Sequence, residues 1–307
     1  MRVLVVASYN KGRFAPFIEE QARALETQGC VILFFGLQGK GIGGYIRNLP
    51  LLKKEVKAFQ PDIIHAHYGL SGLFANMQRR IPVVTTYHGS DINDRKALRF
   101  SKMAMRLSAW NIFVSRQTLG KAQLKKKYSL LPCGVDLSEL QLTEKAEARR
   151  QMHLTIDKKY VLFSGALDNQ VKNAPLAQQA IENLHDDSVA LLELKGYSRE
   201  EVTMLMCAAD ALMMTSFSEG SPQVIKEALA CGCPIVSVDV GDVKERVEGV
   251  ESCYVAKTRE PNELADLLRK ALLFEGKTLG RTRIISDGLD NRQVAEELLN
   301  IYKFVKR

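Results

Sequence analysis

Residues 211–238 read ALMMTSFSEGSPQVIKEALACGCPIVSV, and this stretch indicates how the chain folds. It begins and ends with short apolar runs, and a helical pattern of roughly two to three turns lies between them. Ser221 suits the N-cap of this helix, and Pro222 suits its first position, where the missing N–H costs nothing. Gly232 stands where a left-handed residue commonly ends a helix. Strand, loop, helix and strand in this order predict a βαβ unit with parallel strands.

The loop before this helix carries groups that suit a phosphorylated ligand. Free N–H groups at a helix N-terminus, together with the helix dipole, favour an anion such as phosphate. Gly220 lets a ligand approach the backbone closely. The carboxylates of Glu219 and Glu227 would repel a phosphate, so we expect them to bind hydroxyl groups of a ribose and a hexose. The alternative interpretation is that both carboxylates are solvated charges.

Size and composition indicate a globular protein with two domains. The chain has 307 residues, of which 46% are hydrophobic and 25% charged. No apolar run approaches the roughly 20 residues that span a bilayer, and the N-terminus reads as a buried strand rather than a signal peptide. The six cysteines lack zinc-site spacing, so we expect reduced thiols, no bound metal and a cytoplasmic location.

The charge is distributed unevenly along the chain. Residues 1–142 hold 21 Lys and Arg against 9 Asp and Glu, whereas the remainder holds 22 against 26. A net charge of +12 on residues 1–142 indicates an anionic partner. That partner is either a membrane surface, such as the inner face of the membrane, or an anionic acceptor. The alternative is a solvated surface that keeps the protein in solution. Nucleic acid is not an expected partner, because no reader motif accompanies the basic residues.

Short apolar runs alternate with helical stretches along most of the chain, which predicts two doubly wound α/β domains with parallel sheets. We expect an N-terminal domain over 1–140, a linker over 141–158, a second domain over 159–290 and a terminal helix over 291–307. The pattern predicts four strands in the second domain, starting at Tyr160, and we expect one strand to be missing from this domain. In the first domain the predicted strands are 3–7, 30–35, 62–66, 82–86 and 110–114.

Ligands of such sheets bind beyond the carboxyl ends of the strands, and several polar residues follow the predicted strands directly. His88 begins the sequence His-Gly-Ser-Asp after the fourth strand, where Asp91 also suits a turn. His67 ends the third strand and is either a site residue or a structural one. We interpret His65 as structural and as pointing to the opposite face from His67, so that the two do not share a metal.

The loop after the first strand, SYNKGR at residues 8–13, lacks the Gly-x-Gly-x-x-Gly fingerprint of dinucleotide-binding enzymes. A nicotinamide-dependent oxidoreductase is therefore not favoured, although the α/β pattern would suit one. From its residues alone, this loop reads as an ordinary turn between a strand and a helix.

Three motifs together resemble the GT4 family of retaining glycosyltransferases. The motif E-G-x-P followed by E-A-x-A-x-G-x-P is similar to the donor-site signature of that family and occurs here at 219–234. The second motif is H-G-S-D at 88–91. The third, L-P-C-G-V-D at 131–136, resembles the segment that leads out of the first domain, with Cys133 in place of the usual Asn. Lys172-Asn173 also matches a family motif in the first turn of the second domain.

The resemblance implies the GT-B fold, in which two Rossmann-like domains face each other across a cleft, with the acceptor on the first and the donor on the second. It also implies that the C-terminal helix crosses back to the first domain. The implied donor is a nucleotide sugar such as a UDP- or GDP-sugar, with no further cofactor. No D-x-D metal motif occurs in the sequence, so the implied reaction is metal-independent transfer of a hexose with retention. The implied acceptor is a glycan or lipid-linked saccharide of polysaccharide or glycolipid biosynthesis.

The family motifs also imply roles for single residues. The catalytic candidates are His88, Glu219 and Lys172. The acceptor-side candidates are Arg13, His67 and Asp91. The donor-binding candidates are Gly12, Gly165, Lys172, Asn173, Glu219, Gly220, Ser221, Pro222, Gln223 and Glu227.

The sequence departs from the family pattern at two positions. Ala166 stands where the family carries an Arg that neutralises the donor diphosphate, and Asp242 replaces a glycine in a later loop. Loss of the Arg removes a bidentate phosphate partner, whereas Lys172 remains as a point charge. The second hypothesis is therefore a non-catalytic module that binds a nucleotide sugar.

Overall fold

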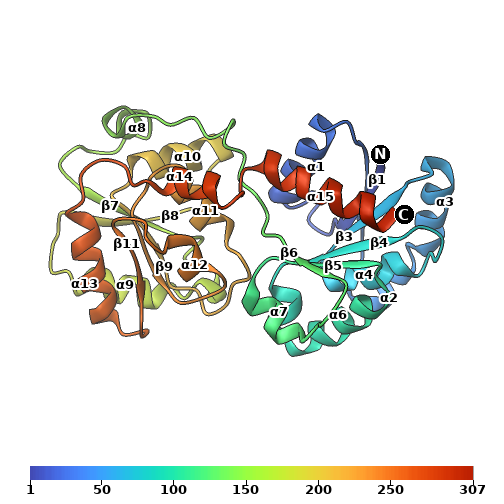
Figure 1. Ribbon diagram of the computed structural model, residues 1–307. Helices are drawn as coiled ribbons and strands as arrows, with labels where there is room; N and C mark the ends of the chain where they lie inside the picture. Colours follow the sequence, from blue (N-terminus) through green and yellow to red (C-terminus); the bar gives the residue numbers. More distant parts are fainter. Residues whose placement is uncertain (307) are drawn as a thin grey trace. The chain divides into compact units, whose positions relative to one another are not determined.

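The computed structural model describes residues 1–306, except for the side chain of Ile42. The chain divides into two compact units. The first unit contains Met1–Gly134 and residues 289–306, and the second contains Val135–Gly288. Each unit is built around one sheet with helices on both faces, as Figure 1 shows.

The first unit holds a six-stranded parallel sheet in the order β2-β1-β3-β4-β5-β6. The strands are β1 (Arg2–Ser8), β2 (Val31–Leu37), β3 (Ile63–His67), β4 (Val83–Tyr87), β5 (Trp110–Phe113) and β6 (Tyr128–Leu130). The helices are α1 (Pro16–Thr27), α2 (Gly41–Ile46), α3 (Leu49–Phe59), α4 (Gly69–Asn76), α5 (Ser90–Asn93), α6 (Arg95–Leu107), α7 (Arg116–Ala122) and α15 (Asn291–Lys306).

Alternate residues of the central strand β1 enter two separate cores. Val3 and Val5 pack with side chains of α1 and α15 on one face of the sheet. Leu4 and Val6 pack with side chains of α3 and α4 on the other face. Because side chains alternate along a strand, a strand that is apolar at every position is buried on both faces. This explains why the run at 3–7 shows no polar alternation.

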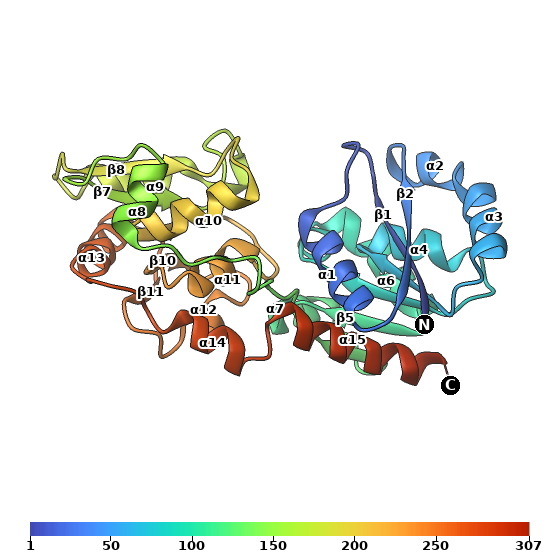
Figure 2. The same cartoon turned by 90° about the horizontal axis from the view of Figure 1, so that it is seen from above.

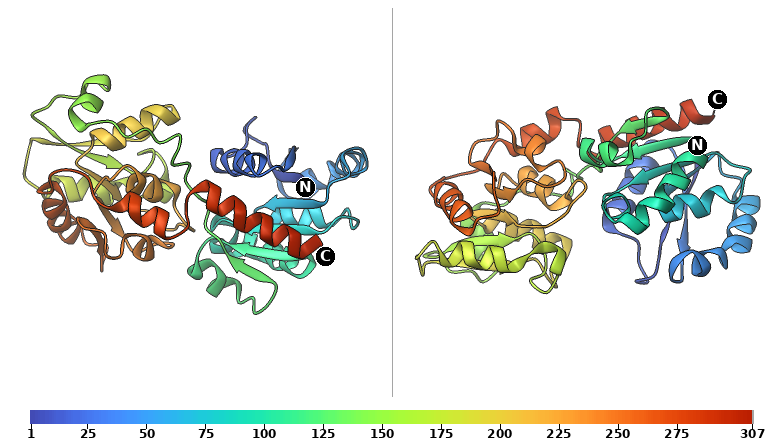
Figure 3. Two further views of the ribbon diagram at one scale, coloured as in Figure 1. Left: turned by 45° about the horizontal axis from the view of Figure 1, so that its top comes forward. Right: turned by 90° about the horizontal axis from the view of Figure 1, so that it is seen from below.

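The last helix of the chain, α15, belongs to the first unit. Val294, Leu298 and Tyr302 are buried in the same core as β1, and α15 packs against α1. Figure 2 and the left view of Figure 3 show α15 (red) beside α1 (blue). The terminal residues of the chain thus complete the core of the N-terminal sheet.

The second unit repeats the same strand order in five strands. Its sheet has the order β11-β10-β9-β7-β8, all parallel, so the first strand of each unit lies between the second and the third. The strands are β7 (Lys159–Phe163), β8 (Val189–Glu193), β9 (Ala211–Met214), β10 (Ile235–Val238) and β11 (Cys253–Ala256). From β7 the chain adds β8 on one side of the sheet and then β9 on the other, so the order of strands reverses between β7 and β9. Ligands of doubly wound sheets bind at such a switch point.

Helices cover both faces of this second sheet, with α9 and α13 on one face and α10 and α11 on the other (Figure 1). A short 3₁₀ turn, Gln170–Lys172, precedes α9. The helices are α8 (Lys145–Gln151), α9 (Ala174–Glu182), α10 (Arg199–Ala208), α11 (Gln223–Ala230), α12 (Val243–Val247), α13 (Pro261–Leu272) and α14 (Gly280–Ser286).

The structure differs from the sequence-based boundaries in three places. The first unit ends at Gly134 rather than at 140. Residues 141–158 belong to the second unit rather than forming a linker, because Arg149 of α8 is buried and forms an ion pair with Asp210 (2.7 Å). The short edge strands β6 and β11 were not predicted, since neither contains a long apolar run.

Candidate active site

Two loops of the second unit meet at the switch point between β7 and β9. Lys172, in the loop after β7, donates a hydrogen bond from Nζ to Oε1 of Glu219, in the loop after β9, over 2.8 Å. The two side chains are 19% and 18% exposed. The structure thus brings together two of the predicted catalytic residues, which lie 47 positions apart in the sequence.

The backbone around Lys172 is held in place by neighbouring groups. The side chain of Lys172 lies across Gly165, where a Cβ atom would approach Lys172 Cε and Cγ to 3.1 Å. The hydroxyl of Thr215 donates to the carbonyl oxygens of Lys172 and Asn173, both over 2.9 Å. Asn173 adopts a left-handed conformation (φ 54°) and is the N-cap of α9. The end of β9 therefore fixes the loop that carries the cation.

The loop at 219–222 rests on a second loop, which follows β10. A Cβ atom on Gly241 would approach the carbonyl oxygen of Gly220 to 2.7 Å, so only glycine fits there. Ser221 donates a hydrogen bond from Oγ to Oδ2 of Asp242 over 2.8 Å. The expectation that Ser221 caps the helix is wrong, because α11 begins at Gln223 and its N-cap is Pro222, without a side-chain cap.

Asp242 is the centre of a buried charged cluster that sequence reasoning missed. It is 3% exposed, and the fully buried Lys226 and the guanidinium of Arg246 (Nε to Oδ2, 3.3 Å) act on its carboxylate. Burial raises the pKa of Asp242, and the two cations oppose that shift. Arg246 also forms an ion pair with Asp287. Asp242 was a departure from the family pattern, and this cluster gives it a structural role.

Glu227 lies in the middle of α11 and is nearly buried. Its Oε1 accepts a hydrogen bond from NH1 of Arg199, the first residue of α10, over 2.6 Å. A charge-assisted pair of this kind fixes the orientation of the carboxylate. Arg199 was not among the predicted site residues, because nothing in its local sequence points to a partner 28 positions away.

In the first unit, the predicted residues His67 and His88 are in contact. His67 Nδ1 and His88 Nε2 lie 3.0 Å apart, and Sγ of Cys133 lies 3.8 Å from His88 Nδ1. The rings of Phe17 and Tyr68 enclose His88 at centroid distances of 4.9 and 4.6 Å. Burial lowers the pKa of His67 well below its usual value, so His67 is neutral and orients the imidazole of His88.

The two histidines of β3 lie on the same face of the strand, so the expectation of opposite faces is wrong. Residues two positions apart share a face of a strand, and the rings of His65 and His67 are 4.3 Å apart. His65 bonds the hydroxyl of Thr86 (2.8 Å) and the hydroxyl of Tyr302 (2.6 Å). Burial lowers the pKa of His65 to about 3. His65 therefore links the sheet to the C-terminal helix.

Asp91 organises the loops after β3 and β4. Its carboxylate accepts hydrogen bonds from the backbone N–H groups of Gly69 (2.9 Å), His88 (3.0 Å) and Gly89 (3.0 Å). Asp91 is 6% exposed, and burial raises its pKa to about 6. These contacts favour the turn interpretation of Asp91 over direct contact with an acceptor.

Gly12 and Arg13 are exposed in the loop after β1, and Gly12 adopts a left-handed conformation (φ 70°). Both residues line a cavity of about 540 Å³ beside α1. His88 and Gly12 lie in the first unit, whereas Glu219 and Glu227 lie in the second. Their approach across a cleft stays a prediction.

Within residues 1–306, no group of three or more His, Cys, Asp and Glu side chains is arranged to hold a metal ion. None of the helices described there is long and apolar enough to cross a membrane.

Two protein-family models match the chain. The model described as Glycosyltransferase Family 4 matches residues 2–139, and the model described as Glycosyl transferases group 1 matches residues 162–273. The matched segments correspond to the N-terminal part of the first unit and to most of the second unit.

Curated relatives of this chain are named as glycosyltransferases. A Bacillus subtilis protein named for a glycosyltransferase of teichuronic acid biosynthesis, TuaC, is 27% identical over 271 residues, which cover 79% of this chain and 68% of that protein. The amylovoran biosynthesis glycosyltransferase AmsK of Erwinia amylovora is 28% identical over 257 residues, which cover 69% and 61%. The chain thus spans about two thirds of the length of these two relatives.

Solved structures with the same architecture cover nearly the whole chain. Sucrose-phosphate synthase of Thermosynechococcus elongatus superposes with a TM-score of 0.81 at 18% identity, covering 99% of both chains. Anabaena Alr3699/HepE in complex with UDP superposes with a TM-score of 0.73 at 18% identity, covering 98% of this chain and 99% of that one. The two units of this protein form the GT-B fold, and the chain belongs to the family 4, group 1 glycosyltransferases.

Proposed function

We propose that this protein is a retaining glycosyltransferase that moves a hexose from a nucleotide sugar to a glycan or lipid-linked saccharide. The observation that carries the proposal is the contact between Lys172 and Glu219 at the switch point of the second sheet. A cation and a carboxylate side by side suit a ligand that presents a diphosphate next to sugar hydroxyls.

The proposed roles follow from the contacts of each residue. Lys172 and the uncapped N-terminus of α11 stabilise negative charge on the departing diphosphate. Glu219 binds a hexose hydroxyl, and Glu227, oriented by Arg199, binds the ribose hydroxyls. The anomeric carbon exchanges its bond to the diphosphate for a bond to the acceptor oxygen, and the acceptor proton passes to the departing phosphate oxygen. This scheme requires no metal ion.

Named relatives support the choice of substrates. Anabaena Alr3699/HepE was solved with UDP-glucose, which supports a nucleotide-sugar donor. UDP-sugars are therefore the first donors to test, and GDP-sugars are the second. TuaC, AmsK and the Escherichia coli protein WcaL are named for the biosynthesis of teichuronic acid, amylovoran and colanic acid. We therefore propose a role in polysaccharide assembly.

Ala166 favours the alternative of a module that binds a nucleotide sugar without transferring the sugar. A second cation lies in the neighbouring loop, however, because Lys195 forms an ion pair with Asp168 (2.6 Å), two residues from Ala166. We propose that Lys195 supplies the charge that the missing Arg would supply. In that case a Lys195→Met variant lowers turnover, whereas in a pure binding module there is no turnover to lower.

The experiment that separates the two functions is release of nucleoside diphosphate from a panel of UDP- and GDP-sugars, with and without lipid-linked glycan. Acceptor-dependent release that falls strongly in a Lys172→Ala variant supports the enzyme. A Lys158→Ala variant, which changes an exposed lysine of the same unit, serves as the control and keeps wild-type turnover. Tight donor binding without release for any pair supports the binding module.

The charge of the first unit supports a further proposal, that this unit binds an anionic membrane surface where a lipid-linked acceptor is found. Residues 95–135 contain ten basic residues and no Asp or Glu. The helix α6 in this segment also exposes Met103 (49%) and Leu107 (57%) beside its basic side chains. Apolar and basic side chains on one helix suit the interface of an anionic bilayer.

Flotation with liposomes of phosphatidylcholine and phosphatidylglycerol tests this proposal. We expect binding that rises with the anionic lipid fraction and falls with salt, because exposed charges are screened. Replacing Lys96, Arg99 and Lys102 together by glutamine should abolish binding to the liposomes. Absence of binding at low salt would leave solubility as the role of these charges.

A further inference from the structure

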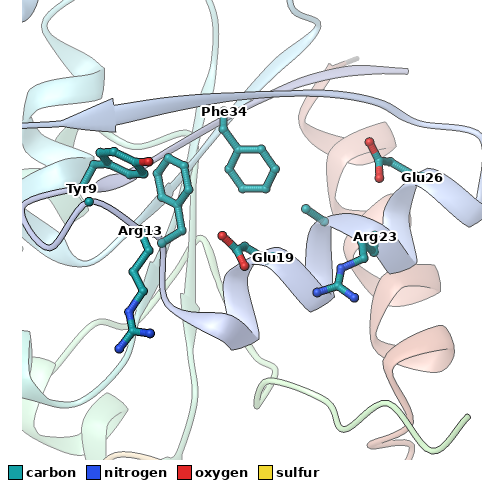
Figure 4. Close-up of a pocket in the computed structure, with 9 residues that line it drawn as sticks. Tyr9, Arg13, Glu19, Arg23, Glu26 and Phe34 are labelled. Atoms are coloured by element: carbon teal, nitrogen blue, oxygen red, sulfur yellow. The ribbon is translucent and has the colours of Figure 1, made fainter. Parts of the chain in front are cut away.

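The first unit contains a cavity of about 540 Å³ between the loop after β1, the helix α1 and the strand β2. This volume lies within the range of about 300–1,000 Å³ that is common for small-molecule sites. None of its lining residues belongs to the contacts of His67 and His88 described above. Figure 4 shows Phe34 pointing from its strand toward α1, which contributes Glu19, Arg23 and Glu26.

One side of the cavity is made of three aromatic rings. The ring of Phe14 lies 4.8 Å from that of Tyr9 and 4.9 Å from that of Phe34, measured between centroids. All three rings are only partly buried, so ring surface remains open to a ligand. Gly36 makes room for this arrangement, because a Cβ atom there would approach Tyr9 Cβ to 2.7 Å.

The opposite side of the cavity is one face of α1. Glu19, Ala22, Arg23 and Glu26 are spaced at i, i+3, i+4 and i+7, which places them on the same side of a helix. In Figure 4 the side chains of Glu19 and Glu26 extend toward the side of α1 on which Phe34 lies, whereas the guanidinium of Arg23 lies on the other side of the ribbon, and Ala22 leaves space between the two carboxylates. Arg13 lies at the rim and turns away from the rings in Figure 4.

This combination has the chemistry of a saccharide site. The faces of aromatic rings carry negative partial charge and attract the C–H groups on the flat side of a sugar ring. Carboxylates and guanidinium groups hydrogen-bond to pairs of hydroxyls. The two acidic and two basic side chains of the lining balance each other, so a neutral sugar suits the cavity better than a phosphate or a uronate.

We propose that this cavity binds a neutral hexose residue of the acceptor glycan, away from the end that receives the new sugar. The assignment to the acceptor rests on the proposed function. The other side of α1 carries Phe17, whose ring lies 4.9 Å from His88. The cavity and the histidine pair therefore lie on two sides of the first turns of α1, which is about 10–12 Å across with its side chains, so the bound hexose is separated from the acceptor end by more than one sugar unit.

Saturation-transfer NMR on the full chain tests the proposal without any donor. The probes are the neutral trisaccharides maltotriose, cellotriose and β-1,4-galactotriose, with glucuronate as the anionic comparison. We expect one or more neutral trisaccharides to bind more tightly than glucuronate. A Phe34→Leu variant keeps the apolar packing and removes the ring, and it should weaken that binding about fivefold to tenfold. A Glu19→Gln variant should weaken it as well.

The matched control is Phe304→Leu. Phe304 is an exposed phenylalanine of the same unit that contacts Trp110 of β5, three strands away from β1 in the sheet, and its replacement should leave binding unchanged. Binding by no neutral trisaccharide, or equal binding by the wild type and Phe34→Leu, would overturn the proposal. If the protein binds a saccharide but transfers sugar from no donor, the proposed saccharide site is supported and the proposed transferase activity is refuted. Sugar transfer with unchanged binding in Phe34→Leu would refute only the site.

Discussion

A replacement of Asp242 by asparagine tests the buried cluster behind the proposed donor loop. The substitution preserves the shape of the side chain and an oxygen that accepts the hydrogen bond from Ser221. It removes the negative charge beside Lys226, which is fully buried, and Arg246. Breaking a buried ion pair by removing one partner costs about 3–5 kcal/mol, so we expect a loss of about 3 kcal/mol in the second unit.

Hydrogen exchange followed by mass spectrometry measures this loss in each unit separately. A loss of about 3 kcal/mol corresponds to roughly 150-fold faster exchange of protected amides in residues 211–247. Peptides from residues 63–113 of the first unit serve as the internal reference and should not change. A Lys226→Met variant and the double variant complete a cycle, in which we expect the two changes to be strongly non-additive.

The matched control is Asp266→Asn in α13. Asp266 is 68% exposed and pairs with Arg269, itself 47% exposed, so its replacement should change stability by no more than about 0.5 kcal/mol. Exchange in Asp242→Asn within threefold of the wild type would refute the reasoning, because the buried cations would then not depend on Asp242.

Three further predictions concern single contacts. A Glu227→Ala variant should weaken binding of UDP or the donor by about 1.5–3 kcal/mol, measured by calorimetry, because charge-assisted hydrogen bonds to the ribose are lost. An unchanged affinity would contradict the proposed contact of Glu227 with the ribose. An Arg199→Met variant should show a smaller loss of affinity. A Tyr302→Phe variant leaves Nδ1 of the buried His65 without its partner and should lower the free energy of unfolding of the first unit by about 1–3 kcal/mol, whereas wild-type stability would show that water replaces the hydroxyl. Burial holds the pKa of His65 at about 3, so as the pH falls below 6.5 this histidine is protonated in the unfolded chain but not in the folded one. The contribution of His65 to the free energy of unfolding is therefore fully present above pH 6.5 and should fall by about 1.4 kcal/mol per pH unit between pH 6 and pH 4. A His65→Gln variant should lose that part of the slope in urea unfolding across pH, and an identical slope would refute the assignment.

Local chemistry was predictable where one stretch of chain decides the conformation. Gly232 was expected to end a helix, and it follows α11 with φ 70°. The capping box that Ser115 forms with Thr118 at the start of α7 likewise joins residues only three positions apart. Each of these features depends on residues within one or two turns, so the sequence pattern is sufficient.

Contacts between distant segments were not predictable in the same way. The hydroxyl of Ser221 had the right position for an N-cap, but Asp242, 21 residues later, accepts its hydrogen bond instead. The same holds for Glu227, whose partner Arg199 comes from another helix. Such pairs depend on which loops the sheet order brings together, and the strand order is a property of the whole unit.

The strand pattern itself was informative about the architecture but not about side-chain partners. Fully apolar runs such as 3–7 predicted strands covered on both faces, and the structure confirms two doubly wound parallel sheets. The faces of His65 and His67 follow from the two-residue period alone and were misinterpreted. Their partner Tyr302 lies 237 positions away from His65, beyond the range of any local pattern.

The most direct test of the central claim is the anomeric configuration of the product, read by proton NMR after reaction of a matched donor and acceptor in the presence of EDTA. The account predicts that the wild type forms the new glycosidic bond with the same configuration as the donor and that Lys172→Ala forms little of it. A product of inverted configuration, or a reaction that stops with EDTA and resumes with added metal, would contradict the account.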